Sequence, residues 1–248
     1  MAAEITIRFY EELNDFLPAH KKKVPLVAVI KGNPAVKDVI ESFNVPHTEI
    51  DLVLVNGTPK AFDYKIQHGD FISVFPVFEL LNINRLKKPG KSLRITKFIL
   101  DVHLGKLARY LRFLGFDTYY RNDLDDDEII KRSVSERRII LTRDKGILKN
   151  GSVTHGYYVR NQKPRRQLQE IIDKFDLKEE IKPFSRCSCC NGRIKKVSKQ
   201  SVISHLKPLT IKHFNEFYQC TECKNVYWEG SHFEKLSGWI QQFRNAEE

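Results

Sequence analysis

Three aspartates in the middle of the chain have the residue type and the setting expected of metal ligands. Asp101 follows the apolar run 98–100, Asp144 comes shortly after the apolar run 139–141, and Asp126 lies between them where a helix is expected to begin. The carboxyl ends of strands in an open parallel sheet are where such proteins bind ligands. Hard divalent cations prefer oxygen ligands. The pattern therefore predicts a site that holds Mg²⁺ or Mn²⁺ and cleaves phosphodiester bonds.

The acids also have ordinary structural explanations. An acid at a helix start caps free N–H groups and complements the helix dipole, and Asp144 suits a turn. Within the acidic stretch, Asp123, Asp127 and Glu128 compete with Asp126 for the role of third ligand. Acids at two strand ends and one helix start favour a site, because crowded carboxylates repel one another unless a cation holds them.

Four of the five cysteines form two C-x₂-C pairs separated by 29 residues. These four are Cys187, Cys190, Cys220 and Cys223. The spacing is typical of one structural zinc ion surrounded by four thiolates. Cys189 is expected to lie outside the site, although the alternative in which it replaces a neighbour as ligand stays open. Cysteines in metal-binding pairs are typical of a reducing compartment, so we expect the protein in the cytoplasm.

The formal net charge of +11 is unevenly distributed. Residues 1–80 carry 8 Lys/Arg against 11 Asp/Glu, whereas residues 81–248 carry 34 against 20, a net charge of +14. A basic field of this kind indicates a polyanionic partner such as nucleic acid, and solubility alone explains it equally well. The candidate contacts to a nucleic acid backbone are Lys106, Arg109, Arg112, Arg143 and Lys145. For each of them a solvated surface is the alternative.

Residues 1–81 read as a small mixed domain. Residues 4–9 alternate with period two like a half-buried strand, residues 35–43 have an apolar helical face, and further strands are expected at 52–55 and 71–76. This order resembles the ubiquitin-like β-grasp of sulfur-carrier proteins (the MoaD/ThiS type). Those carriers act through a C-terminal Gly-Gly that this chain lacks. We therefore expect a docking or regulatory module with a protein partner, or a structural accessory.

The remainder divides into a linker and two domains. Residues 82–97 are polar and basic, as in a linker. Residues 98–182 alternate strand and helix, which indicates a mainly parallel α/β sheet, and residues 183–248 hold the cysteines. The expected strands of the α/β domain are 98–102, 117–121, 138–142 and 156–160. Its second helix is expected to turn Ile129, Ile130 and Val134 inward. No apolar run is long enough for a membrane helix, and no secretory leader is expected.

The block ILDVHLGKLARYLRFLGFDT…DDDEII…RIILTRDKGIL closely resembles the PIN-like RNase family named after the C-terminal region of the Mut-seven exonuclease. The resemblance continues through both cysteine pairs to residues 226–232, and residues 1–81 are similar to the ubiquitin-like domain that accompanies this family. It implies a PIN-type fold, a metal-dependent ribonuclease activity on RNA and a zinc ribbon. Asp101, Asp126 and Asp144 match the family's acids. A homodimer is a further expectation of this resemblance.

One departure bears on the activity. Typical PIN nucleases present a fourth acid after a later strand, and residues 154–161 offer none. One metal ion, or a second held loosely, is then expected. The leading hypothesis is an endoribonuclease in which Asp101, Asp126 and Asp144 hold the metal. A second is an RNA- or ribosome-associated binding protein without turnover, and a third is an adaptor that recruits a partner through the ubiquitin-like domain.

Overall fold

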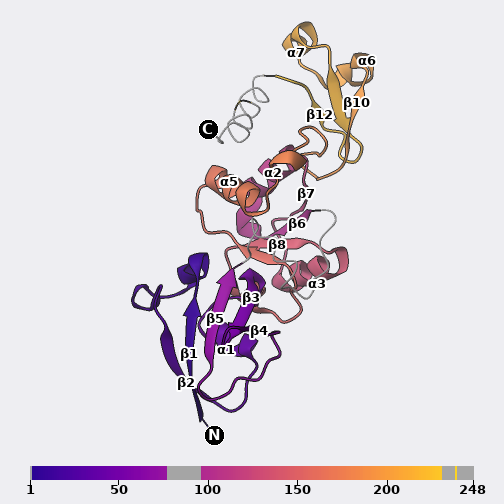
Figure 1. The fold of residues 1–248 in the computed structure, drawn as a ribbon. Coiled ribbons are helices and arrows are strands. Elements are labelled where there is room, and N and C mark those ends of the chain that lie inside the picture. The colour runs from indigo at the N-terminus through magenta and orange to yellow at the C-terminus, as the bar shows by residue number, and fades with distance from the viewer. Residues whose placement is uncertain (1, 77–95, 231–237, 239–248) are drawn as a thin grey trace. The chain divides into compact units, whose positions relative to one another are not determined.

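The computed structural model describes residues 2–76, 96–230 and 238, and the chain divides into two units. Unit 1 comprises residues 1–95 and 125–158, and unit 2 comprises residues 96–124 and 159–248. Figure 1 labels many of the elements of both. The expected linker at 82–97 lies outside the described residues, except for its last two. No described helix has both the length and the apolar character needed to cross a membrane.

The first part of unit 1 is a five-stranded sheet with one helix, as expected of a β-grasp. Its strands lie in the order β2-β1-β5-β3-β4, with β1 and β5 parallel at the centre and the other pairs antiparallel. The elements are β1 (Ala2–Phe9), η1 (Glu11–Phe16), η2 (Ala19–Lys21), β2 (Leu26–Lys31), α1 (Val36–Ser42), η3 (His47–Glu49), β3 (Ile50–Val55), β4 (Thr58–Pro59) and β5 (Phe71–Pro76). The prediction of a ubiquitin-like fold is confirmed.

The core of this sheet follows from the period-two pattern of β1. Ile5, Ile7 and Phe9 are buried on one face, together with residues of α1 such as Val39 and Ile40. A strand places alternate side chains on opposite faces. On the other face, Val27 and Val29 of β2 are 68% and 64% exposed. This apolar exposure distinguishes the outer face of β2 from the core side.

The rest of unit 1 belongs to the α/β domain. It contains α3 (Asp126–Glu136), β8 (Ile139–Thr142), α4 (Lys145–Lys149) and β9 (Gly156–Tyr158), and β8 and β9 pair in parallel. Every residue of β8 is buried, as is typical of a parallel strand covered on both faces. The expectation that Val134 of α3 faces inward is wrong, because it is 48% exposed. Ser133 is buried instead, and its hydroxyl donates to the Arg138 carbonyl oxygen, which fixes the turn into β8.

Unit 2 begins with the other parallel strand pair of the α/β domain, β6 (Lys97–Leu100) and β7 (Asp117–Tyr119). Between them lie η5 (Val102–Leu104) and α2 (Gly105–Phe113), and α5 (Pro164–Lys174) and η6 (Lys178–Glu180) come later in the chain. The buried stripe of α2, which includes Leu107 and Leu111, packs in contact with α5. Gly115 ends α2 at φ +97°, and an added Cβ would lie 2.3 Å from the Lys182 carbonyl oxygen, so only glycine fits.

The cysteine-bearing part of unit 2 is a three-stranded antiparallel sheet. Its strands are β10 (Ile194–Val197), β11 (Phe217–Cys220) and β12 (Val226–Tyr227), in that order. Three short helical segments connect β10 to β11: α6 (Lys199–Val202), η7 (Ile203–His205) and α7 (Pro208–His213). The sheet has a small core in which Phe217 is fully buried. The chain thus has the expected order of β-grasp, parallel α/β sheet and C-terminal cysteine cluster.

Candidate functional site

Asp101 directly follows β6 in unit 2, so it lies at the end of a strand as predicted. It is 6% exposed, and its backbone carbonyl accepts a hydrogen bond of 2.9 Å from the Leu104 N–H. The three strand residues before it are buried. A buried strand followed at once by a helical turn therefore holds this carboxylate at the strand end.

At the start of α3 in unit 1, the neighbouring acids Asp125 and Asp126 have different positions. Asp125 is the N-cap residue, and its Oδ1 accepts a hydrogen bond of 2.7 Å from the Glu128 N–H. Asp126 is the first residue of the helix and is exposed. Because Asp125 satisfies the capping role, capping does not explain Asp126.

Asp144 follows β8 in unit 1 and is oriented by its neighbours. Its N–H donates to the Thr142 Oγ1 at 2.8 Å, and its Oδ1 accepts from the Gly146 N–H at 2.6 Å. Among the described residues, no hydrogen bond or ion pair is formed to Oδ2. The residue is exposed. One oxygen is thus held by the backbone while the other is available to a ligand.

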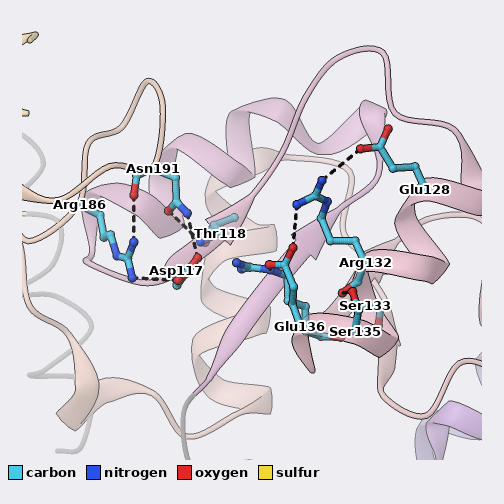
Figure 2. A network of polar contacts seen from close by, with 10 residues as sticks. Asp117, Thr118, Glu128, Arg132, Ser133, Ser135, Glu136, Arg186 and Asn191 are labelled. Atoms are coloured by element: carbon cyan, nitrogen blue, oxygen red, sulfur yellow. Dashed lines mark hydrogen bonds and ion pairs between the residues drawn. The ribbon is translucent and has the colours of Figure 1, made fainter. Parts of the chain in front are cut away.

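Two of the competing acids already have cationic partners. Arg132 pairs with Glu128 at 3.5 Å and with Glu136 at 2.7 Å along α3 (Figure 2). Asp123 pairs with Arg121 at 2.9 Å, and the hydrogen bond from Arg121 lowers the pKa of this carboxyl. Asp127 stays a competitor, and Asp126 stays the predicted third ligand because it matches the acid of the family that the sequence resembles. Three carboxylates suit Mg²⁺ or Mn²⁺ by the chemistry of their oxygens, and their convergence on one ion stays a prediction.

A basic pocket of about 670 Å³ lies within unit 2. It begins two residues after Asp101, at His103. Its charged and amide-bearing lining residues are His103, Lys106, Arg109, Arg112, Arg121, Asn122, Gln162 and Gln167, joined by Tyr120 and Cys189. Three of these, Lys106, Arg109 and Arg112, were predicted from the sequence. His103 and Arg121 were not, although both follow strands of the α/β sheet, which was the available signal.

Arg112 corrects one part of the prediction. Arg112 was expected to contact nucleic acid or to be solvated, and both expectations need an exposed side chain, but it is only 4% exposed. Its guanidinium donates to three backbone carbonyl oxygens, those of Thr118 at 2.9 Å, Cys189 at 2.7 Å and Tyr120 at 3.2 Å. Burial lowers the pKa of Arg112, and the nearby cysteines act to raise it. Arg112 therefore joins α2 to two other segments, and Lys106 and Arg109 are the exposed cations of the helix.

The two remaining predicted cations lie in unit 1. Arg143 is half-buried beside Asp144. The Lys145 ammonium lies 5.1 Å from the centroid of the Phe16 ring and 5.6 Å from that of Tyr158. Burial lowers the pKa of Lys145, and the charge of Lys149 lowers it further. Aromatic rings, which attract cations through their faces, give Lys145 a structural setting that the sequence did not indicate.

The four predicted zinc ligands come together. The ligand atoms of Cys187, Cys190, Cys220 and Cys223 all lie within 4.8 Å of one another. Cys187 and Cys223 approach to 3.5 Å and Cys190 and Cys220 to 3.4 Å between sulfurs, close to the spacing of about 3.8 Å that tetrahedral Zn–S bonds of ~2.3 Å require. Cys189 is exposed and not part of this group. The donor set fits one zinc ion.

The surroundings of the thiols are also those of a metal site. The N–H of Cys190 points to the Cys187 sulfur and that of Glu222 to the Cys220 sulfur, each at 3.4 Å. The Tyr227 hydroxyl lies 2.9 Å from the Cys187 sulfur. Burial acts to raise the pKa of Cys190, but the Gly192 backbone and neighbouring thiols lower it to about 7. Donors of this kind orient thiolate ligands and stabilise their charge.

The cysteine cluster is attached to the α/β domain within unit 2 (Figure 2). Asn191 accepts from the Thr118 N–H at 3.0 Å and donates to Asp117 at 2.8 Å. Arg186 pairs with Asp117 at 2.9 Å. Both residues flank the first cysteine pair, and Asp117 and Thr118 belong to β7. The cluster and the strand thus form one hydrogen-bonded assembly.

Known proteins resemble the chain at the level of families. The family model described as Mut7-C RNAse domain matches residues 96–240, and the model described as Mut7-C ubiquitin matches residues 2–82. Among solved structures, the crystal structure of SAMP1 from Haloferax volcanii matches with 15% identity and a TM-score of 0.25. That match covers 31% of this chain and 98% of SAMP1, a likeness too weak to bear on function. No curated protein matched the chain.

The match to the Mut7-C RNAse domain covers the candidate site residues of both units. Its range includes the segment that holds Asp101 and the basic pocket, the segment that holds Asp126 and Asp144, and both cysteine pairs. The separate match over residues 2–82 agrees with the β-grasp sheet. The chain belongs to the Mut7-C RNAse domain family.

Proposed function

We propose that this protein is a metal-dependent ribonuclease of the PIN-like class that cleaves RNA internally. The observation that carries the proposal is the basic pocket of unit 2, which begins at His103, two residues after Asp101. A phosphodiester substrate needs cations to bind its backbone next to the group that reacts. Membership of the Mut7-C RNAse domain family supports a nuclease.

The exposed cations of the pocket bind RNA phosphates in this proposal. Lys106, Arg109 and Arg121 contribute charge that is independent of base sequence, so they supply affinity and orientation. The amides of Asn122 and Gln162, which also line the pocket, offer donors and acceptors to an unpaired nucleotide. RNA with single-stranded segments is therefore the proposed substrate.

The acids hold the metal in this proposal. Asp101, Asp126 and Asp144 are the proposed ligands of Mg²⁺ or Mn²⁺. The ion, when bound, activates a water molecule and neutralises charge on the phosphate. The backbone N–H of Gly146 donates to one oxygen of Asp144 and so fixes the orientation of the carboxylate. The second oxygen of Asp144 is the one proposed to bind the metal.

The test is cleavage of labelled single-stranded RNA with Mg²⁺ or Mn²⁺ by the full chain and by Asp101→Asn and Asp144→Asn. Loss of a group that stabilises charge in the transition state typically slows an enzyme about 100-fold or more, and that loss is expected for both variants. Arg109→Ala should raise KM with little change in kcat. Equal cleavage by wild type and both variants would contradict the assignment and indicate a contaminating nuclease.

A protein that binds RNA without cleaving it is the second candidate. The observation in its favour is that the segment after β9 supplies no further acid, and that Glu170 of α5 accepts from the Arg160 and Asn161 N–H groups at 2.7 and 2.9 Å. That carboxylate is used to fix a loop. Tight RNA binding with the RNA left intact in every divalent cation would favour this candidate over the ribonuclease.

The cysteines bear on the location of the protein. All five cysteines are free thiols, and thiols that hold zinc persist in a reducing compartment, so we place the protein in the cytoplasm. A protein partner of the ubiquitin-like domain and a homodimer stay proposals. Native mass spectrometry of the purified chain tests the dimer directly.

A further inference from the structure

Within unit 1, the β-grasp sheet is in contact with the segment that carries Asp144. The turn η3 (His47–Glu49) contacts both α4 and β9. The chain places more than a hundred residues between Glu49 and Tyr158. Contacts so distant in sequence are made only by the folded unit, so they constrain the segment in a way that no local signal does.

Two side chains of η3 bond to the backbone of this segment. His47 lies 2.8 Å from the Val153 carbonyl oxygen through Nε2 and 2.6 Å from Glu41 through Nδ1, and it is 9% exposed. Glu49 is 4% exposed, and its Oε1 accepts from the Tyr158 N–H. A buried polar group that loses its hydrogen-bond partner destabilises the folded state, so both contacts resist separation.

Aromatic packing adds to these bonds at the beginning of α4. The rings of Phe16 and Tyr158 lie 5.4 Å apart between centroids at an interplanar angle of 64°. Lys145, the first residue of α4, has its ammonium near both rings. At the other end of the helix, Lys149 donates to the Asn44 side-chain oxygen at 2.8 Å. The ubiquitin-like domain therefore contacts α4 at both ends.

Asp144 is the N-cap residue of this same helix, and its Oδ1 is bonded to the Gly146 N–H. A displacement of α4 must move that carboxylate. We propose that the ubiquitin-like domain is a positioning element of the metal site: through His47, Glu49 and Phe16 it holds α4 and thereby the orientation of Asp144. The inference rests on the proposed function, in which Asp144 is a metal ligand, and it assigns the domain a role in cis.

Glu49→Ala in the full chain tests this role, because it removes the acceptor of the Tyr158 N–H. Glu49→Gln retains a side-chain oxygen and is the conservative rescue. Val27→Ser, on the exposed face of the same sheet, is the matched control. Asn44→Gly gives a second, surface-based perturbation, because it removes the acceptor of Lys149 at a residue whose φ of +70° glycine adopts freely. The measurements are hydrogen exchange of peptides covering residues 145–158 and the affinity for Mn²⁺ alone, by electron paramagnetic resonance.

We expect Glu49→Ala to accelerate exchange over residues 145–158 and to weaken Mn²⁺ binding about 10-fold, the lower end of the loss seen when groups that orient ligands are removed. Asn44→Gly should shift both the exchange rate and the Mn²⁺ affinity in the same direction by less. Glu49→Gln and Val27→Ser should match wild type. Faster exchange with unchanged Mn²⁺ affinity, or unchanged exchange, would overturn the positioning role.

The proposed function fails separately. If the wild-type chain does not cleave RNA and Asp144→Asn binds Mn²⁺ as tightly as wild type, the ribonuclease assignment fails and this inference fails with it. If the wild-type chain cleaves RNA and Asp144→Asn binds Mn²⁺ more weakly, but Glu49→Ala behaves like wild type, this inference alone is overturned.

Discussion

The cysteine cluster and the acids are both built from metal-binding residue types, but the protein assembles them differently. The cluster draws its ligands from two short segments of unit 2, one before β10 and one at the end of β11, with all ligand atoms within 4.8 Å of one another and backbone donors aimed at two of the sulfurs. Asp101 belongs to unit 2, whereas Asp126 and Asp144 belong to unit 1. Asp144 is already stabilised by a backbone N–H. Metal should therefore be needed for folding at the cluster and for chemistry alone at the acids.

The largest expected effect is loss of the zinc. Cys220→Ser removes one of four ligands, so the chain should lose its one zinc ion and the sheet of β10, β11 and β12 should unfold. Structural zinc contributes about 10–16 kcal/mol of apparent binding free energy in small zinc domains. Metal analysis and hydrogen exchange measure this, and Cys189→Ser is the matched control that should keep its zinc. Zinc loss in both would bring Cys189 back as a ligand.

The next effect concerns the residue that joins the cluster to the α/β domain. Arg112→Ala leaves three carbonyl oxygens without this donor, and buried acceptors left unpaired cost about 1–3 kcal/mol each, so a loss of at least about 3 kcal/mol in the free energy of unfolding is expected. Arg109→Ala, on the exposed side of α2, should leave stability unchanged and weaken RNA binding. Denaturant unfolding and RNA titration of both variants separate the two roles. A stable Arg112→Ala with weak RNA binding would restore the original prediction for Arg112.

A smaller effect is expected from the hydroxyl beside the cluster. Tyr227→Phe removes the group 2.9 Å from the Cys187 sulfur and keeps the ring. Loss of such a neighbour typically weakens metal binding about 10- to 100-fold. Competition with a chelator at constant pH measures the change in zinc affinity. Tyr218→Phe, in the adjacent strand β11, is the control, and equal affinities for all three proteins would show that the hydroxyl does not support the thiolate.

The smallest effect should come from the acids themselves. Asp126→Asn should change the free energy of unfolding by less than about 0.5 kcal/mol, as is usual for surface substitutions. Asp125→Ala, which removes the N-cap of the same helix, should cost about 1 kcal/mol. Thermal unfolding of the zinc-loaded chain without added Mg²⁺ or Mn²⁺ gives both values. A strong destabilisation by Asp126→Asn without added Mg²⁺ or Mn²⁺ would mean that this acid has a structural role. The acids would then resemble the cysteines in supporting the fold.

The sequence predicted features that depend on residues close together in the chain, and it missed features that depend on contacts between distant segments. The spacing of Cys187, Cys190, Cys220 and Cys223 led to the observed cluster, because two short turns suffice to present four thiols. The alternation in β1 predicted its buried face for a similar reason. Arg112 was placed on the wrong side because helical periodicity alone cannot tell an exposed cation from one that finds carbonyl partners in another segment. Val134 was misplaced because the local pattern did not show that Ser133 closes the turn to Arg138.

The sequence by itself determined the order of the domains, the four cysteines that cluster and the acids at strand ends, since these follow from periodicity and spacing within short segments. Only the tertiary structure decided which cations form the pocket, that Arg112 joins α2 to the cluster, and that η3 holds the helix capped by Asp144. The physical reason is that His47, Glu49 and Arg112 meet partners about 70 to 110 residues away. Whether a polar side chain is solvated or satisfied by a distant backbone group depends on packing, which local sequence does not encode.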